Sequence, residues 1–219
     1  MTHPCQITAI EPLAGNPLLL EVRMGDTSLG TLPRDEVESL GMEIGLAEDD
    51  PRVLRFIHEV ACLKARDEAF RMLALRNRSS GYLTSTLIRR GFSSKVSEQS
   101  VADLCADGWV DDAGYARARL DILRREDGRS AEVCRERLRK EGVPEEVLDS
   151  LLPTTNGDED EIKAACVAIE DMLRKNPRYA DGSPQAGQRI AMSLRRKGFD
   201  PDTMMMAIER MNLDVPDVP

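Results

Sequence analysis

The sequence predicts a mainly α protein, in which tandem three-helix repeats form an elongated curved array behind a small β-rich N-terminal subdomain. Three observations predict this fold class. A pattern of Leu, basic cluster, Gly and apolar residue occurs three times, as "LIRRGF" (87–92), "LRKEGV" (138–143) and "LRRKGF" (194–199). Charged residues make up 32% of the chain and aromatic residues only 4%, which is typical of helices with solvated faces around an aliphatic core. The first fifty residues, by contrast, contain short β-type segments.

The N-terminal segment predicts three strands and a short helix. The strands are expected at "QITAIEP" (6–12), "PLLLEVRM" (17–24) and "TSLGTL" (27–32), with a turn at Gly25-Asp26. Pro33 is expected to open a short helix over 33–42, whose first turn carries Asp35 and Glu36, where the helix dipole favours carboxylates.

A long amphipathic helix is expected next. Asp50 is a good N-cap and Pro51 suits the first helical position. Apolar residues then recur at intervals of three and four. The helix is expected to end near Arg78, about 28 residues on, as either two helices or one kinked helix.

The repeats divide the rest of the chain. Ser79 and Ser130 each stand twelve residues before a glycine and are expected to cap the helix that this glycine closes, and Ser183-Pro184 opens the third such helix. A further helix is expected before and after each of these three helices. The expected division is a β-rich subdomain at 1–48 and helical repeats at 49–109, 110–152 and 153–219.

The repeated motif has first a structural interpretation. A glycine just past a helix adopts the left-handed conformation that other residues resist, and basic residues in the last turn face the negative end of the dipole. The glycines concerned are Gly91, Gly142 and Gly198. Asp111 and Asp112 follow Trp109 at an expected helix start, where capping is the ordinary explanation and magnesium ligation the alternative.

The motifs of common enzymes are missing from the sequence. It contains no GxxxxGK[ST], GxGxxG, HExxH or GxSxG, and only two histidines. Its five cysteines are dispersed without a CxxC pair, so neither a metal site nor a cofactor is expected. No apolar run is long enough to cross a membrane and no signal peptide is recognisable, which indicates a soluble cytoplasmic protein. We also expect a monomer, and the missing motifs predict a protein without catalytic residues.

Clustered cations are the remaining candidates for function. The net charge is −9, but residues 1–48 carry −6 of it, whereas residues 49–109 carry +2. Basic residues recur at corresponding places in the repeats. They are Arg76, Arg78, Arg89, Arg90, Arg124, Arg125, Arg139, Lys140, Arg195, Arg196 and Lys197. Two interpretations stay open: a solvated helix face, or a row of guanidinium groups that binds phosphates or an acidic protein groove.

Three stretches resemble the RecX family, the bacterial regulators of the RecA recombinase. They are "LRNRSSGYLTSTLIRRGF" (75–92), "GWVDDAGYA" (108–116) and "LRRKGFDPDTMMMAI" (194–208), and the likeness extends over about residues 65–212. The resemblance implies a curved array of three-helix repeats lodged in the groove of the RecA–DNA filament. The expected partners are therefore the RecA filament and single-stranded DNA within or near it. It implies a role in homologous recombination, DNA repair and the SOS response, in which the protein lowers RecA recombination, ATP turnover and co-protease activity without chemistry of its own.

The chain also departs from the family pattern. It is acidic, it carries an insertion, "KNPRYADGSP" (175–184), and Val143 replaces Phe in the second copy. The acidic balance weakens the expectation of strong independent DNA binding. The alternatives are a free-standing helical DNA-binding module and a repeat scaffold for another protein.

Overall fold

A computed structural model describes residues 5–125, 128–152, 159–176, 179 and 184–213 of the chain. Within them the protein is mainly helical with one small antiparallel sheet at its start, as the sequence predicts. The chain splits into two compact units, one of residues 1–77 and 83–110 and the other of residues 78–82 and 111–219. The predicted helix start at Ser183 lies outside the described residues.

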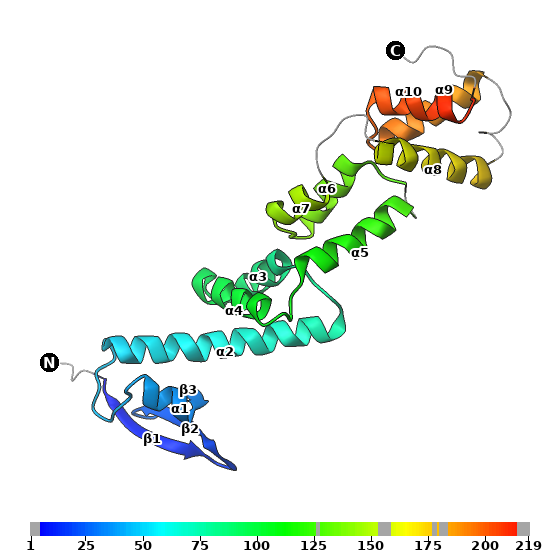
Figure 1. Cartoon of the computed structure of the whole chain (residues 1–219). Coiled ribbons are helices and arrows are strands. Elements are labelled where there is room, and N and C mark those ends of the chain that lie inside the picture. The colour runs from blue at the N-terminus through cyan, green and yellow to red at the C-terminus, as the bar shows by residue number, and fades with distance from the viewer. Residues whose placement is uncertain (1–4, 126–127, 153–158, 177–178, 180–183, 214–219) are drawn as a thin grey trace. The chain divides into compact units, whose positions relative to one another are not determined.

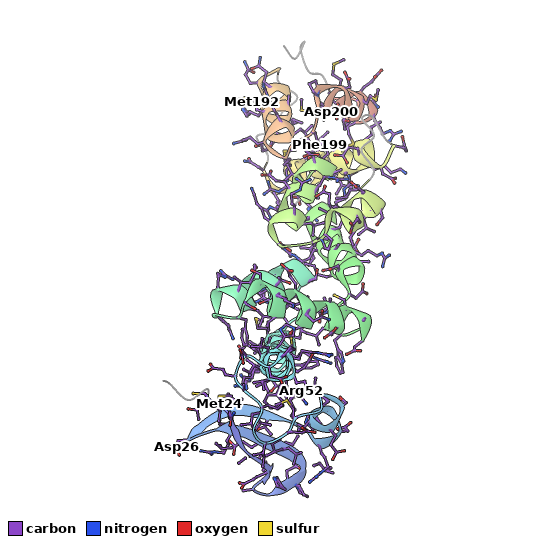
Figure 2. The ribbon with its side chains drawn as sticks, turned by 90° about the vertical axis from the view of Figure 1, so that its left-hand side faces the viewer. Met24, Asp26, Arg52, Met192, Phe199 and Asp200 are labelled. Carbon is purple, nitrogen blue, oxygen red and sulfur yellow. The ribbon has the colours of Figure 1, made fainter. Side chains whose placement is uncertain are left out.

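The first unit begins with a three-stranded antiparallel sheet in the order β1–β2–β3 (Figure 1). The strands are β1 (Ile7–Leu13), β2 (Asn16–Met24) and β3 (Thr27–Pro33), close to the predicted segments. Gly15 and Gly25 have φ of 87° and 59° in the two hairpin turns, where glycine avoids the strain that a side chain brings. Figure 2 labels Met24, the last residue of β2, and Asp26, which lies in the second turn.

Helix α1 (Arg34–Ser39) is shorter than the helix predicted over 33–42. Pro33 is its N-cap and not its first residue, and Gly41 with φ of 65° stops it. One face of the sheet packs with α1 and the start of the next helix around a shared core. That core consists of Ile7, Leu20, Val22, Leu32, Val37, Met42, Val53, Phe56 and Val60.

Helix α2 (Pro51–Leu75) is a single helix of 25 residues. Its start is as predicted, because an Asp50 carboxylate oxygen accepts the Arg52 N–H at 2.9 Å and Pro51 is the first helical residue. Its predicted end near Arg78 is wrong. Arg76 is extended (φ −171°, ψ 155°) and ends the helix at Leu75.

Helices α3 (Ser80–Arg89) and α4 (Ser94–Ala106) follow. Ser93 caps α4 by accepting the Val96 N–H at 3.3 Å. Helix α4 packs along α2, and the Ser100 hydroxyl donates to the Cys62 carbonyl at 3.2 Å between them. After α4 in the sequence, the Trp109 ring packs edge to face against the Phe70 ring of α2, with the ring centroids 5.2 Å apart.

The second unit contains two groups of three helices, which Figure 1 labels α5 to α7 and α8 to α10. Each group has a hydrophobic core of its own. The first trio is α5 (Asp112–Arg125), α6 (Ala131–Lys140) and α7 (Glu145–Leu151), around Ala116, Leu123, Cys134, Leu138, Val143, Leu148 and Leu152. The second is α8 (Glu159–Lys175), α9 (Pro184–Arg196) and α10 (Pro201–Arg210). Its largest fully buried side chains are Ile169, Ile190 and Leu194.

Among the described residues, no helix is both long and apolar enough to span a bilayer. All five cysteines carry free thiols; Cys62, Cys134 and Cys166 are buried, whereas Cys5 and Cys105 are exposed. Burial raises the pKa of the Cys134 thiol to about 11, so it behaves as a small apolar side chain.

Candidate protein and nucleic-acid interface

The three repeated segments end in the same backbone turn. Their glycines have positive φ, 97° at Gly91, 82° at Gly142 and 91° at Gly198. In each turn the glycine N–H donates to the carbonyl three residues back, and the following N–H donates to the carbonyl five residues back, at 3.0 to 3.2 Å. This is a Schellman motif, which glycine forms without the strain of a side chain.

The turn at Gly142 is also a point of close approach inside the second unit. The Gly81 N–H, in the first turn of α3, donates to the Gly142 carbonyl at 3.1 Å. The buried Ser79 hydroxyl donates to the carbonyl of Glu141 and accepts the Tyr82 N–H at 3.2 Å. A methyl group on Gly142 would lie 2.5 Å from the Tyr82 nitrogen, so this turn requires glycine for space as well as for conformation.

The turn at Gly198 makes the corresponding contact. The Ser130 N–H donates to the Lys197 carbonyl at 3.1 Å, and the Ala131 N–H donates to the Glu161 carboxylate at 2.8 Å. A methyl group on Gly198 would lie 2.5 Å from the Ser130 hydroxyl oxygen. The serine that begins one repeated helix therefore contacts the glycine turn that ends the next. The first turn, at Gly91, has no atom within 4 Å of such a methyl group.

Asp111 and Asp112 act at the same junction. An Asp111 carboxylate oxygen accepts the Gly114 N–H at 2.8 Å at the start of α5, and Asp112 accepts the Ser80 N–H at 2.8 Å. The Asp112 contact corresponds to that of Glu161. Among the described residues, no group of three His, Cys, Asp or Glu side chains is arranged to hold a metal ion.

Several of the predicted interface cations form ion pairs within the chain. The pairs are Arg90 with Glu68, Arg124 with Glu161, Arg139 with Glu145 and Lys140 with Glu136. The guanidinium of Arg139 is bidentate, at 2.9 and 2.7 Å, and holds the pKa of Glu145 down at about 2. These cations are less available to a partner than their sequence suggests, because a new anion has to displace a carboxylate.

Three other predicted cations lie around α3. The Arg78 guanidinium stacks over the Tyr82 ring at 4.2 Å, and its Nε is buried without a hydrogen-bond partner among the described residues. Arg76 is exposed at the end of α2. Arg89 is exposed and donates to the Thr86 hydroxyl at 2.9 Å. The side chain of Arg125, the last residue of α5, lies outside the described part.

The last turn of α9 differs from the other sites. Arg195 and Arg196 are exposed and form no hydrogen bond or ion pair with the other described residues. They line a hollow of about 420 Å³ together with Arg189, Met192 and Tyr179. Figure 2 shows Met192 on α9, where its side chain is 66% exposed. Lys197, the next residue, is half-buried beside the Gly198 turn.

Sequence reasoning missed a buried ionic group in the second unit. Arg135 is only 7% exposed, and its guanidinium donates to Glu145 at 2.8 Å, to Asp149 at 2.7 Å and to the Leu152 carbonyl at 2.6 Å. Its position on the inner side of α6, between Cys134 and Leu138 in sequence, could have suggested burial. Its partners lie on α7 and beyond, which no local pattern reveals.

A second missed group surrounds Glu141, the residue before Gly142. Arg119 donates two hydrogen bonds to its carboxylate, at 2.9 and 2.6 Å, and the Tyr115 hydroxyl donates a third at 2.8 Å. The Arg119 hydrogen bonds lower the pKa of Glu141 below its ordinary 4.5, and burial raises the pKa of Tyr115. This group holds the Gly142 turn against α5.

Known proteins resemble this chain in sequence and in fold, although no family model matches it. A protein of Trichlorobacter lovleyi named "Regulatory protein RecX" is 28% identical over 147 residues, which cover 65% of this chain and 92% of that protein. A protein of the same name from Bacillus subtilis is 21% identical over 95% of this chain and 78% of its own length. The sequence comparison supports the assignment of the chain to the RecX family.

The fold agrees with this assignment. A solved structure, described as "Crystal structure of regulatory protein RecX", superposes with a TM-score of 0.65 at 16% identity and covers 93% of this chain and 98% of its own. A RecX structure from Lactobacillus salivarius superposes with a TM-score of 0.58 over 70% of this chain. The sequence-based assignment to the RecX family is thereby confirmed, and the RecX relatives are named as regulators and not as enzymes.

Proposed function

We propose that this RecX-family chain binds the filament that the RecA recombinase forms on DNA and regulates it, mostly by inhibition. In this proposal it lowers RecA recombination, ATPase and co-protease activity, performs no chemistry, and acts in the cytoplasm as a monomer. The observation that carries the proposal is the family assignment, since the family is that of the RecA regulators. The exposed Arg195 and Arg196, free of carboxylate partners among the described residues, add an anion-binding surface.

We also propose that residues 49–109, 110–152 and 153–219 are three copies of one module. Support comes from the Schellman turns at all three glycines and from the two equivalent junctions, in which Ser79 meets the Gly142 turn and Ser130 meets the Gly198 turn. Each junction ties a helix start in one copy to a helix end in the next. A partner that follows the modules would therefore meet the same features in series.

The predicted interface cations do not contribute equally to the proposed binding. Arg195 and Arg196 are unpaired among the described residues, so binding an anion there breaks no ion pair with any of these residues. Arg124 is held by Glu161 at a module junction, which points to a structural role. Arg89 and Arg90, at the exposed end of α3, remain candidates, with Arg90 exchanging Glu68 for a partner carboxylate or phosphate.

The test is a titration of RecA ATP hydrolysis on single-stranded DNA with the purified protein. The proposal predicts a progressive fall in hydrolysis rate that saturates. An unchanged rate at several-fold molar excess over RecA would count decisively against it.

A free-standing DNA-binding module is the second candidate, favoured by the cationic hollow at α9. It predicts tight binding to DNA without RecA, which falls steeply with salt. The net charge of −9 opposes it over the chain as a whole. Gel shifts at physiological salt separate the two candidates, because only the second predicts a stable complex without RecA.

A further inference from the structure

The glycine turn that ends α3 is exposed, whereas the equivalent turns at Gly142 and Gly198 are each covered by the start of another helix. We propose that the open turn at Gly91 is a docking site for the N-terminal turn of a helix in a partner protein, namely a subunit of the RecA filament. The inference rests on the proposed function for the identity of this partner. It adds the surface of this chain and the kind of structural element that meet there.

The two covered turns show what such a turn binds. At Gly142 the covering segment is the first turn of α3, whose Gly81 N–H donates to the Gly142 carbonyl at 3.1 Å. At Gly198 it is the start of α6, where the Ser130 N–H donates to the Lys197 carbonyl at 3.1 Å. In both places N–H groups at the start of one helix meet carbonyl groups at the end of another, so the positive end of one helix dipole faces the negative end of the other.

The turn at Gly91 has the same backbone as its two equivalents but lacks a covering segment among the described residues. Its Gly91 N–H donates to the Ile88 carbonyl at 3.0 Å, and the Phe92 N–H donates to the Leu87 carbonyl at 3.2 Å. Gly91 is exposed, and a methyl group on it would meet no described atom within 4 Å. At Gly142 and Gly198 such a group would lie 2.5 Å from an atom of the covering segment. The open turn therefore has room for a helix start directly against its backbone.

The surface beside the open turn is apolar where the other two copies are cationic. Ile88, in the last turn of α3, corresponds to Arg139 and Arg195 in the other copies. The Ile88 side chain is 40% exposed. Phe92, which follows the glycine, is half-buried, whereas Phe199 at the corresponding place is only 3% exposed. The open turn thus carries apolar surface for the hydrophobic residue that often precedes a helix N-cap.

A helix start suits this surface better than a nucleic acid does. The carbonyl groups of the turn accept hydrogen bonds and carry the partial negative charge of a helix C-terminus, which repels phosphate. A helix start supplies N–H donors that have no partner inside their own helix, and the carboxylates frequent in a first helical turn complement the exposed Arg89. Both internal covering segments begin with a serine, Ser79 and Ser130, followed by a small residue. The expected occupant is a helix that begins in the same way.

The test substitution is Gly91→Asn. Asparagine tolerates the left-handed conformation, so the turn is kept while a side chain fills the space that the partner helix needs. The protein concentration that halves RecA ATP hydrolysis on single-stranded DNA should rise roughly 5- to 150-fold, the range that overpacking of a close contact gives. Ile88→Gln removes the apolar surface with a good helix former and should raise this concentration roughly tenfold.

The chain offers a matched control for each variant. Gly108→Asn places the same side chain on the turn that ends α4, where φ is 77°, the two turn hydrogen bonds are 3.0 and 2.9 Å, and an added methyl group would meet nothing within 4 Å. Ile122→Gln removes an isoleucine of α5 that is 41% exposed. Both controls should inhibit as the wild type does, and the two asparagine variants should have the same urea midpoint. Equal losses of inhibition in a variant and its control would overturn the inference.

Cross-linking identifies the occupant. Ile88 is replaced by the photoreactive p-benzoylphenylalanine, the protein is irradiated on RecA filaments, and the cross-linked peptides are sequenced by mass spectrometry. The inference predicts that the RecA residue captured lies in the first turn of a helix. Capture of the middle of a RecA helix, of the DNA or of a second copy of this chain would contradict it, and so would the absence of any cross-link.

Failure of the inference is distinguishable from failure of the filament proposal. If the wild type leaves RecA ATP hydrolysis unchanged, the filament proposal fails and this inference fails with it. If the wild type inhibits and Gly91→Asn inhibits equally well, only the inference fails.

Discussion

Replacing Gly142 with alanine should destabilise the protein more than replacing Gly91 with alanine, although the two glycines end equivalent helices. Both have positive φ, 82° and 97°. An L-residue in the left-handed region costs roughly 1–2 kcal/mol, and this cost is common to both substitutions. The difference between the two losses in the free energy of unfolding therefore reports the packing around each turn.

The surroundings differ sharply. The new methyl group would meet open space at Gly91, but at Gly142 it would lie 2.5 Å from the Tyr82 nitrogen and 2.8 Å from the Gly81 carbonyl carbon. Both are backbone atoms, which cannot rotate away. Overpacking of this kind typically costs about 1–3 kcal/mol. The substitution at Gly142 should thus cost about 2–5 kcal/mol in all, against about 1–2 kcal/mol at Gly91.

The assay is urea denaturation followed by far-ultraviolet circular dichroism, with hydrogen exchange of the α6 and α7 amides to locate the loss. Gly108→Ala is a second control, because Gly108 has φ of 77° and nothing within 4 Å of an added methyl group. If all three variants lose the same free energy to within about 0.5 kcal/mol, the close approach between Gly142 and the start of α3 does not stabilise the protein.

Three further outcomes are expected. Arg119 lowers the pKa of Glu141 below 4.5, so the ionised carboxylate stabilises the folded protein above pH 4.5, and this stabilisation is lost as the pH falls through the folded pKa. Glu141→Gln should therefore make the midpoint of urea denaturation depend less on pH between pH 6 and pH 3. Arg135→Met should cost about 1–3 kcal/mol in urea denaturation, since it leaves the Leu152 carbonyl without its 2.6 Å donor, and wild-type stability in this variant would contradict the buried network. A thiol reagent should modify two of the five cysteines quickly in the native protein and all five in urea, the fast pair being Cys5 and Cys105.

Local features could be predicted from the sequence because their signals are local. Asp50, Ser93 and Asp200 cap helices through N–H groups two or three residues away, which a short motif encodes. The three glycine turns are local for the same reason. The end of α2 was placed too late, because the residues between Leu75 and Ser79 are polar and give no periodic signal against continuing the helix.

The availability of the arginines could not be predicted, because their partners come from distant helices. Arg124 pairs with a carboxylate 37 residues away, and Arg90 pairs with Glu68 on another helix. Conversely, the α9 hollow depends on Tyr179 and Arg189, which no repeat pattern singles out. Charge clusters in a sequence show where cations are frequent. Which of these cations lack a carboxylate partner within the chain depends on tertiary packing. The predicted curvature of the array stays a prediction.

The most direct test of the central claim, that this chain regulates the RecA filament through exposed cations, is the RecA ATPase titration repeated with charge reversals. Arg195→Glu with Arg196→Glu, and separately Arg89→Glu with Arg90→Glu, should raise the concentration needed for half-maximal inhibition at least tenfold, about 1.4 kcal/mol of lost binding. The control reversal of Arg174 and Lys175 should leave it unchanged. Equal inhibition by the wild type and by both reversed variants would contradict the claim.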